Sequence, residues 1–177
     1  MRIIAGQFRG RRLLGPTGAG VRPTSDSLRE TLFNVLGQTM EGLRVLDGFA
    51  GTGALGLEAL SRGAAHVTFV EQDRRALDVL MKNVRACGVE DACAIIRDDF
   101  SRGRWGGFDL VLIDPPYEIG DLDAVVTAGG ACVAPAGRLV LEHSRRRASP
   151  ESAGTLRRTR VLSAGQSALS FYNQTGT

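Results

Sequence analysis

The chain has 177 residues, 43% of them apolar and 23% charged, with a net charge of +3. This composition excludes a disordered or fibrous chain, and the length fits one domain with its own core and at most a short appendage. No window approaches the ~20 consecutive apolar residues of a membrane span, and the N-terminus lacks a secretory signal pattern. We therefore expect a cytoplasmic protein.

Cysteine usage points the same way. Cys87, Cys93 and Cys132 are odd in number and form neither a CxxC pair nor a cluster with His66 or His143. They are interpreted as reduced thiols in the core, and no metal site is expected.

The basic residues gather near the N-terminus. Residues 1–40 carry six arginines against two acids, Asp26 and Glu30; the arginines are Arg2, Arg9, Arg11, Arg12, Arg22 and Arg29. Such an excess indicates a polyanionic partner. Genome composition is an alternative explanation for any single arginine.

The first elements are predicted outside the main sheet. Residues 1–14 alternate loosely and contain Gly6 and Gly10, which predicts a short strand pair as an appendage. After a Pro- and Gly-rich loop, Thr24 or Ser25 can cap a helix that ends near Gly37. We place the domain boundary here, with an N-terminal hairpin at 1–24 and the main domain at 25–177.

From residue 43 onward, short apolar runs alternate with helical segments, as in a parallel sheet covered on both faces. Strands are predicted at 43–47, 66–70, 93–96, 108–113, 138–142, 156–162 and 168–172, with a turn at Gly165 before the last. Helices are predicted at 54–62, 73–87 and 120–132, the second with Leu77, Leu80, Met81 and Val84 on its buried stripe. The fold class is α/β: a Rossmann-like, seven-stranded, mostly parallel sheet with helices on both faces.

A glycine-rich turn, Asp47 to Gly56, joins the first strand of this sheet to the next helix. Gly51 and Gly53 let a ligand approach the backbone, and free amides at the helix start favour polar or anionic groups. The cofactor-binding residues predicted on the turn are Asp47, Phe49, Ala50, Gly51 and Gly53.

The same glycines satisfy GxGxxG, so an NAD(P) dehydrogenase is an alternative to a methyltransferase. Asp47 favours the methyltransferase, because its carboxylate can hold the amino acid part of S-adenosylmethionine and would repel a pyrophosphate. Glu71, at the end of the second strand, is predicted to accept both ribose hydroxyls. Asp98 and Asp99 follow the third strand, and Asp98 is preferred as the acceptor for the adenine amine.

Asp114-Pro115-Pro116-Tyr117 follows the fourth strand and indicates the chemistry. An exocyclic base amine is a poor nucleophile because its lone pair is delocalised, so a catalyst must hold its nitrogen in line with the methyl donor. Asp114 and the Pro115 carbonyl can accept the two amine hydrogens, while the prolines, Pro116 included, stiffen the loop. Tyr117 offers a flat face for the base.

Five segments together resemble the RsmD-type family of bacterial 16S rRNA guanine-N2 methyltransferases: MRIIAGQFRGRRL, VRPTSDSLRETLFNVL, VLDGFAGTGALGLEALSRGA, VEQD and FDLVLIDPPY. The resemblance implies S-adenosylmethionine as cofactor and N2-methylguanine in small-subunit RNA as product. It also places Arg22 and Thr24 near the active-site mouth, and Arg2, Arg9, Arg11 and Arg12 in contact with RNA. The glycine-rich segment differs from the family in one position, since Gly48 stands where the family carries a larger residue.

Several alternatives stay open. A DPPY loop could equally methylate the N6 amine of adenine in DNA. Alternatively, a chain with this fold could bind RNA during subunit assembly without catalysing any reaction. The substrate is expected to be 16S rRNA in a 30S subunit or assembly intermediate, and the protein a monomer. The run Arg145 to Arg147 is interpreted as a solvated loop, with RNA contact as the alternative.

Overall fold

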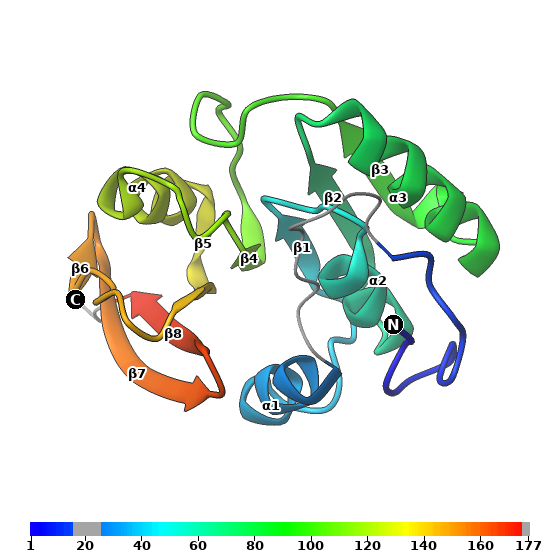
Figure 1. The fold of residues 1–177 in the computed structure, drawn as a ribbon, viewed down its shortest axis with the longest axis horizontal. Helices are drawn as coiled ribbons and strands as arrows, with labels where there is room; N and C mark the ends of the chain where they lie inside the picture. The colour runs from blue at the N-terminus through cyan, green and yellow to red at the C-terminus, as the bar shows by residue number, and fades with distance from the viewer. Residues whose placement is uncertain (16–25, 175–177) are drawn as a thin grey trace.

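The protein is built on one sheet with helices packed on both faces (Figure 1). The computed structural model describes residues 1–15 and 26–174. The strands lie in the order β3-β2-β1-β4-β5-β8-β7-β6. Their bounds are Arg44–Asp47 (β1), His66–Val70 (β2), Cys93–Ile96 (β3), Phe108–Ile113 (β4), Val133–Ser144 (β5), Ser152–Ala153 (β6), Leu156–Ala164 (β7) and Ser167–Gln174 (β8).

The seven predicted strands are all present, and the Rossmann-like arrangement is confirmed. β3, β2, β1, β4 and β5 pair in parallel, and β8 adds antiparallel to β5. Gly165, at φ 62°, turns β7 into β8, as predicted. The two-residue strand β6 is additional, and pairing with β7 defines it rather than any periodicity of its own.

In the described part of the chain, four helices cover the sheet. They are α1 (Asp26–Leu36), α2 (Ala54–Ser61), α3 (Arg74–Cys87) and α4 (Leu122–Cys132), and a 3-10 turn, η1 (Glu90–Ala92), precedes β3. Helices α1, α2 and α3 pack with one set of alternate strand residues, including Val45 and Leu112. Helix α4 packs with the other set, including Leu46 and Val111. The expected cap at Thr24 or Ser25 lies outside the described residues.

Local signals set the ends of α3. The Asp73 carboxylate accepts from the Ala76 amide at 2.8 Å, and Gly88 ends the helix at φ 67°. A side-chain N-cap of this kind stabilises a helix by about 1 kcal/mol. Leu77, Leu80 and Val84 are buried as predicted, but Met81 is 37% exposed and was wrongly assigned to the buried stripe. Met81 directly follows Leu80 in the sequence, so its side chain projects from the edge of the buried face of the helix.

The N-terminal segment differs from the strand pair that its alternation predicts. Its two halves pair only briefly, through one antiparallel bridge between Arg2 and Arg12 and the backbone hydrogen bonds beside it, from Ile3 to Arg11 at 3.0 Å and from Leu13 to Met1 at 3.1 Å. It also lies against α2 and α3 (Figure 1), and Ile3 and Leu13 are buried in the core rather than outside it. Asn83 of α3 accepts from the Leu14 amide at 2.8 Å and donates to the Leu14 carbonyl at 3.1 Å.

A buried carboxylate on α2 holds this segment in place. Glu58 accepts from the amides of Ile4 at 2.8 Å and Ala5 at 3.0 Å, and from Arg62 Nε at 2.9 Å. Its side chain is fully buried, as is almost all of the Arg62 side chain. Since a buried charge is costly unless it is paired and hydrogen-bonded, these three donors make the carboxylate tolerable in the core.

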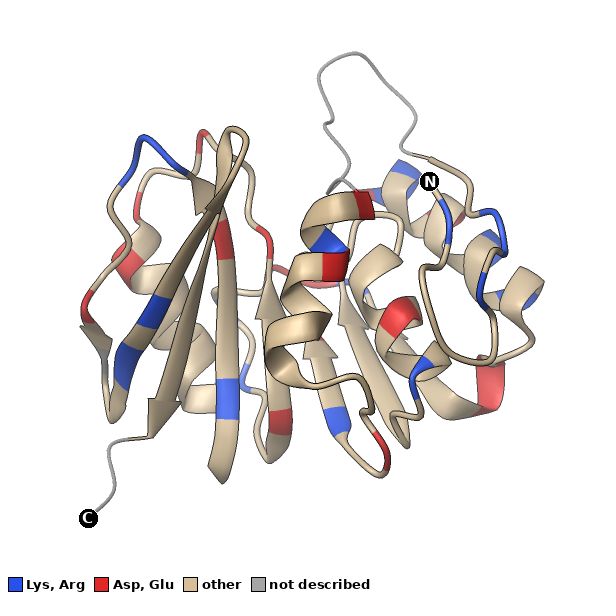
Figure 2. Cartoon of the chain, turned by 90° about the horizontal axis from the view of Figure 1, so that it is seen from below, with Lys and Arg blue, Asp and Glu red and all other residues tan. Residues whose placement is uncertain are grey.

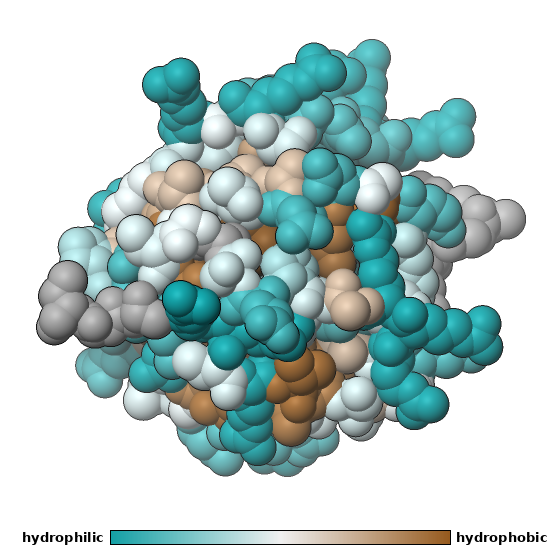
Figure 3. Space-filling view, turned by 90° about the vertical axis from the view of Figure 1, so that its left-hand side faces the viewer, coloured by the Kyte–Doolittle hydropathy of each residue, from teal (hydrophilic) through white to brown (hydrophobic). Residues whose placement is uncertain are grey.

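The far edge of the sheet is mostly polar. Figure 3 shows hydrophilic side chains projecting from the face that carries α4, β6 and β7, with smaller hydrophobic areas between them. A short, polar edge strand discourages pairing with another sheet. Within residues 26–174, no helix combines the length and apolar character needed to cross a bilayer.

Two of the three cysteines are core thiols, as predicted. Cys87 and Cys132 are buried and Cys93 is half-buried, and none is in a disulfide. Burial raises the pKa of the Cys132 thiol to about 11, so this group stays protonated at neutral pH.

The Glu58 arrangement yields a stability prediction. Glu58→Ala should lower the free energy of unfolding by about 3 to 5 kcal/mol, because Arg62 and two amides would lose their buried acceptor. Urea unfolding followed by circular dichroism measures this. Glu30→Ala, which removes an exposed carboxylate from α1, is the matched control and should change stability little. Equal stability of the two variants would contradict the role given to Glu58.

Candidate active site

The glycine-rich turn and the DPPY loop meet at the carboxyl edge of the parallel strands. Beyond Asp47, β1 keeps hydrogen bonding to both neighbours: the Gly48 amide donates to Leu112 of β4 at 2.8 Å and the Ala50 amide to Val70 of β2 at 3.0 Å. The turn is therefore fixed between the ends of β2 and β4. In open parallel sheets, ligands bind at this edge, where the strand order reverses.

The three glycines of GxGxxG have different structural roles. Gly51 has φ 52°, and a Cβ there would meet nothing closer than 4.0 Å, so the surface over it stays open to a ligand. A Cβ on Gly53 would lie 2.3 Å from Leu80, and one on Gly56 2.3 Å from Phe69. These two glycines allow α2 to pack closely on α3 and β2.

Gly48 has a packing role as well. A Cβ at this position would lie 2.6 Å from the Phe100 ring and 2.9 Å from Ile113. Phe100 in turn contacts the half-buried Phe49, with ring centroids 5.3 Å apart and tilted by 53°. The small residue and the phenylalanine therefore fit as a pair beside the turn.

Asp47 is a buried carboxyl with one unsatisfied oxygen. Its Oδ2 accepts from the Gly56 amide at 2.9 Å, whereas its Oδ1 has no partner among the described residues. Burial raises the pKa of Asp47, the Gly56 hydrogen bond opposes this rise, and the nearby charge of Glu71 adds to it; the net result is a pKa of about 7. A cationic or N–H donor arriving at Oδ1 would favour the ionised form.

Glu71 connects the end of β2 to the glycine turn. Its Oε2 accepts from the Gly51 amide and its Oε1 from the Asp73 amide, each at 2.8 Å. Each carboxylate oxygen can accept a further hydrogen bond, so Glu71 is oriented and still able to bind a hydroxyl.

The two aspartates after β3 are in different situations. The Asp99 carboxylate accepts from the Ser101 hydroxyl at 2.7 Å and its amide at 3.0 Å, and it pairs with Arg102 at 3.3 Å. These contacts lower the pKa of Asp99, the Ser101 hydroxyl most strongly. Asp98 is exposed, and its Oδ1 accepts from the Asp99 amide at 2.8 Å. Asp99 thus stabilises its own turn, and Asp98 is the better candidate for a ligand.

In the DPPY loop, Asp114 is half-buried, Pro115 is buried and Pro116 is exposed. Tyr117 is 37% exposed, and its hydroxyl lies 2.5 Å from Ser167 Oγ. The loop then turns back, with the Ile119 amide donating to the Pro116 carbonyl at 2.9 Å. This hydrogen bond closes a turn directly after the second proline of the loop.

Three residues near this loop were missed by sequence reasoning: Ser167 of β8, Glu142 of β5, and Arg147. Arg147 is half-buried, and its guanidinium donates to the carbonyls of Ile119 and Gly120 instead of lying free in solvent. Arg145 and Arg146 are exposed, as predicted. The signal for Glu142 was available, since this acid ends the predicted fifth strand, 138–142, just as Asp47 ends the predicted first strand.

The N-terminal arginines are not equivalent. Arg2 lies 3.8 Å from Asp26, and Arg11 donates to the Ala86 carbonyl and covers the Phe8 ring at 5.4 Å. Arg9 and Arg12 are exposed and make no ion pair with described residues. Figure 2 shows basic residues along this segment. Arg22 and Thr24 lie outside the described residues.

No cluster of three or more potential metal ligands occurs in the described ranges, 1–15 and 26–174.

Comparisons with known proteins identify the family of this chain. The family model described as conserved hypothetical protein 95 matches residues 1–173. Ribosomal RNA small subunit methyltransferase D of Escherichia coli is 42% identical over 128 residues, which are 71% of this chain and 65% of that protein.

Two solved structures are informative. The yhhF structure from Escherichia coli, provisionally named a methyltransferase, has a TM-score of 0.85 at 35% identity, with 98% of this chain and 97% of that chain covered. The Thermus thermophilus 16S rRNA N2 G1207 methyltransferase (RsmC), in complex with AdoMet and guanosine, has a TM-score of 0.72 at 25% identity, with 90% and 45% covered. Since the family model matches almost its whole length, the chain belongs to the conserved hypothetical protein 95 family, that of the RsmD-type rRNA methyltransferases.

Proposed function

We propose that this protein transfers a methyl group from S-adenosylmethionine to the exocyclic N2 amine of a guanine in 16S rRNA. The observation that carries the proposal is the hydrogen bond from Gly48 to Leu112, which holds the glycine turn beside the strand that leads into DPPY. Two relatives support it: one is named a small-subunit rRNA methyltransferase, and the other is an N2 methyltransferase of 16S rRNA.

The residues at the carboxyl edge fit this cofactor. The unsatisfied Oδ1 of Asp47 suits an ammonium group, and the open surface over Gly51 suits a ligand close to the backbone. Glu71 would accept from the ribose hydroxyls, Asp98 would accept from the adenine amine, and Phe49 and Ala50 would line the turn. Asp99 has the weakest claim, because Ser101 and Arg102 occupy its carboxylate. When bound, S-adenosylmethionine supplies a methyl group on a positively charged sulfur, which keeps the electron pair of the broken bond.

The DPPY loop would hold the acceptor amine. The Asp114 carboxylate and the Pro115 carbonyl accept its two hydrogens, which leaves the nitrogen lone pair directed toward the methyl group. The nitrogen–carbon bond forms and the amine then loses a proton, for which Asp114 is a candidate acceptor. Tyr117 stacks on the base, and Pro116 stiffens the backbone between Pro115 and Tyr117.

Arginines of the N-terminal segment would contact RNA phosphates. Arg9 and Arg12 are exposed and form no ion pair with described residues, whereas Arg2 and Arg11 have partners within the chain. Arg22 and Thr24 complete the proposed RNA-binding set, and we keep residues 1–24 as a functional unit distinct from 25–177.

The substrate would be a 30S particle or assembly intermediate in the cytoplasm, and the enzyme would act as a monomer without a metal.

Asp114→Asn tests the chemistry. The variant should lose about 10²-fold or more in methyl transfer to 30S particles, because an amide oxygen cannot match the carboxylate as an acceptor. Affinity for S-adenosylmethionine, measured by calorimetry, should stay near that of the wild type. Asp123→Asn, an exposed change on α4, is the control. Full activity of Asp114→Asn would remove Asp114 from the mechanism, and methylation of duplex DNA in preference to 30S particles would favour the adenine alternative.

The raised pKa of Asp47 predicts how cofactor affinity depends on pH. A cofactor ammonium stabilises the ionised carboxylate, so affinity should rise with pH up to about 7, by at most about tenfold per pH unit, and then level off. Asp47→Asn should bind more weakly and lose this rise, while retaining any titration of the cofactor itself. Identical pH profiles for the two proteins, measured by calorimetry between pH 5 and pH 8, would contradict the contact.

The same raised pKa affects the stability of the free protein with the opposite sign. Folded Asp47 holds its proton more tightly than the unfolded residue, whose pKa is near 3.8, so stability should fall as pH rises from about 4 to 7. Asp47→Asn should flatten this decline in urea unfolding.

Arg9→Ala with Arg12→Ala tests the proposed binding of RNA by the N-terminal segment. The salt dependence is the slope of the logarithm of the binding constant against the logarithm of the salt concentration. This slope should become less steep by about 0.7 to 0.9 for each phosphate that an arginine no longer neutralises. Filter binding to 30S particles at several salt concentrations measures this slope. Arg157→Ala with Arg160→Ala, which removes two exposed arginines from β7, is the control of equal charge. If only the β7 variant changed the slope, the RNA-binding surface would have to be assigned to the opposite end of the sheet.

A further inference from the structure

The DPPY loop is held from outside by side chains of the antiparallel part of the sheet. β8 runs opposite to β5, with Ser167 paired to Ser144. Because of this reversal, β8 begins at the edge where the parallel strands end. Ser167, its first residue, is thereby brought next to Tyr117, which is fifty positions earlier in the sequence.

A chain of hydrogen bonds fixes the Tyr117 ring. Ser167 donates to Glu142 Oε1 at 3.1 Å, and its oxygen lies 2.5 Å from the Tyr117 hydroxyl. A serine hydroxyl has one hydrogen. Since Ser167 gives that hydrogen to Glu142, Tyr117 must be the donor in the shorter contact.

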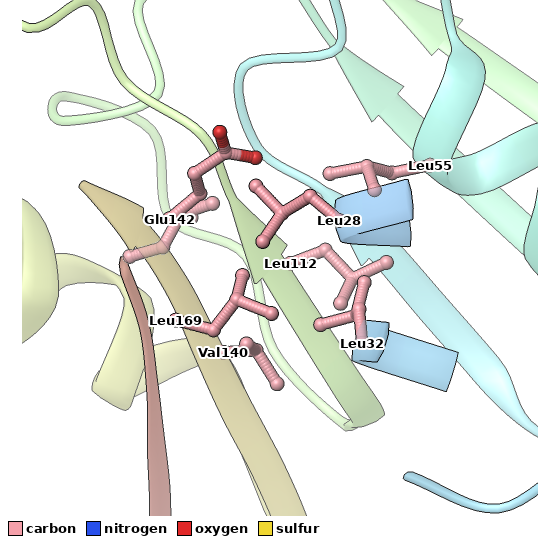
Figure 4. A pocket seen from close by; sticks show the side chains of 8 residues that line it. Leu28, Leu32, Leu55, Leu112, Val140, Glu142 and Leu169 are labelled. Atoms are coloured by element: carbon pink, nitrogen blue, oxygen red, sulfur yellow. The ribbon is translucent and has the colours of Figure 1, made fainter. Parts of the chain in front are cut away.

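Burial makes this chain a firm support. Glu142 is 6% exposed and Ser167 9% exposed, so water competes little for either group. Figure 4 shows Glu142 beside Leu28 at the rim of a small apolar pocket, with Leu112, Val140 and Leu169 among its lining. The Tyr117 ring, by contrast, is partly exposed and so keeps a surface free for a base.

Arg147 supports the other end of the loop. Its two terminal nitrogens donate to the adjacent carbonyls of Ile119 and Gly120, the second at 2.7 Å. The planar guanidinium can hold two acceptors in fixed geometry, which a lysine ammonium does less well. A small pocket lined by Pro115, Tyr117, His143 and Arg147 lies between this contact and the prolines.

We propose that Ser167 and Arg147 are positioning residues for methyl transfer, Ser167 acting through the Tyr117 hydroxyl and Arg147 through the backbone of residues 119–120. Glu142 completes the support by orienting the Ser167 hydroxyl. None of the three has to touch the cofactor. They fix the direction of the stacking face and of the amine acceptors, because a displacement of about 1 Å at such a site can cost 10²-fold in rate. The inference rests on the proposed methyl transfer.

A double-mutant cycle tests the Ser167 contact. Ser167→Ala and Tyr117→Phe both remove the same hydrogen bond and leave the ring in place. Each should lower kcat for 30S methylation by about tenfold, and the double variant should lose no more than either single variant. The KM for S-adenosylmethionine should not change. Ser163→Ala, an exposed serine on β7, is the control.

The Arg147 contact is tested by exchange. Arg147→Ala should lower kcat with an unchanged cofactor KM, and Arg147→Lys should restore only part of the loss. Arg145→Ala, an exposed neighbour, should behave as the wild type. Urea unfolding of every variant separates a loss of rate from a loss of folded protein.

The outcomes distinguish this inference from the function on which it rests. A wild-type protein that does not methylate 30S particles would overturn the proposed function. An active wild type whose Ser167→Ala and Arg147→Ala variants match it would overturn only the positioning roles. Multiplying losses in the Ser167 and Tyr117 double variant would show that the two act separately, which also contradicts the proposal.

Discussion

The central constraint in this molecule is the two-sided pairing of β1, which continues past the strand itself. Gly48 and Ala50 still donate to β4 and β2 after the chain has left the regular ladder. The turn that follows cannot move without breaking bonds to both neighbours. Asp47, the glycines and the DPPY loop take their relative positions from this pairing, because each belongs to one of the three paired strands or directly follows one.

Two buried carboxylates show how the same chemical group serves different purposes. Glu58 is satisfied by two amides and a buried arginine, and it holds the N-terminal segment against α2. Asp47 has one amide donor and an oxygen without a described partner, and burial raises its pKa to about 7. The first arrangement is complete within the chain. The second would be completed by a ligand that brings a donor or a positive charge, which is why we assign Asp47 to the cofactor.

The antiparallel addition to the sheet contributes to the site as well as to the core. A parallel strand beside β5 would begin at the opposite edge, far from the DPPY loop. The reversed β8 places its first residue beside Tyr117. The connection after β5 places Arg147 where it can donate to the Ile119 carbonyl. The loop is thus supported by β4 on one side and by Ser167 and Arg147 on the other.

The sequence by itself determined the elements and the order of the candidate site. Apolar runs predicted β2, β3 and β4 to the residue, and Asp47 and Glu71 could be placed at strand ends. These features depend on neighbours within a few positions, where side-chain periodicity and capping act. Tertiary structure alone decided the rest: Ile3 and Leu13 joined the core, Met81 faced solvent, Asp99 was used by its own turn, and Ser167 and Arg147 reached the DPPY loop. Those outcomes depend on contacts between residues far apart in the sequence, or on which margin of a helix another element covers, and local pattern carries no record of either.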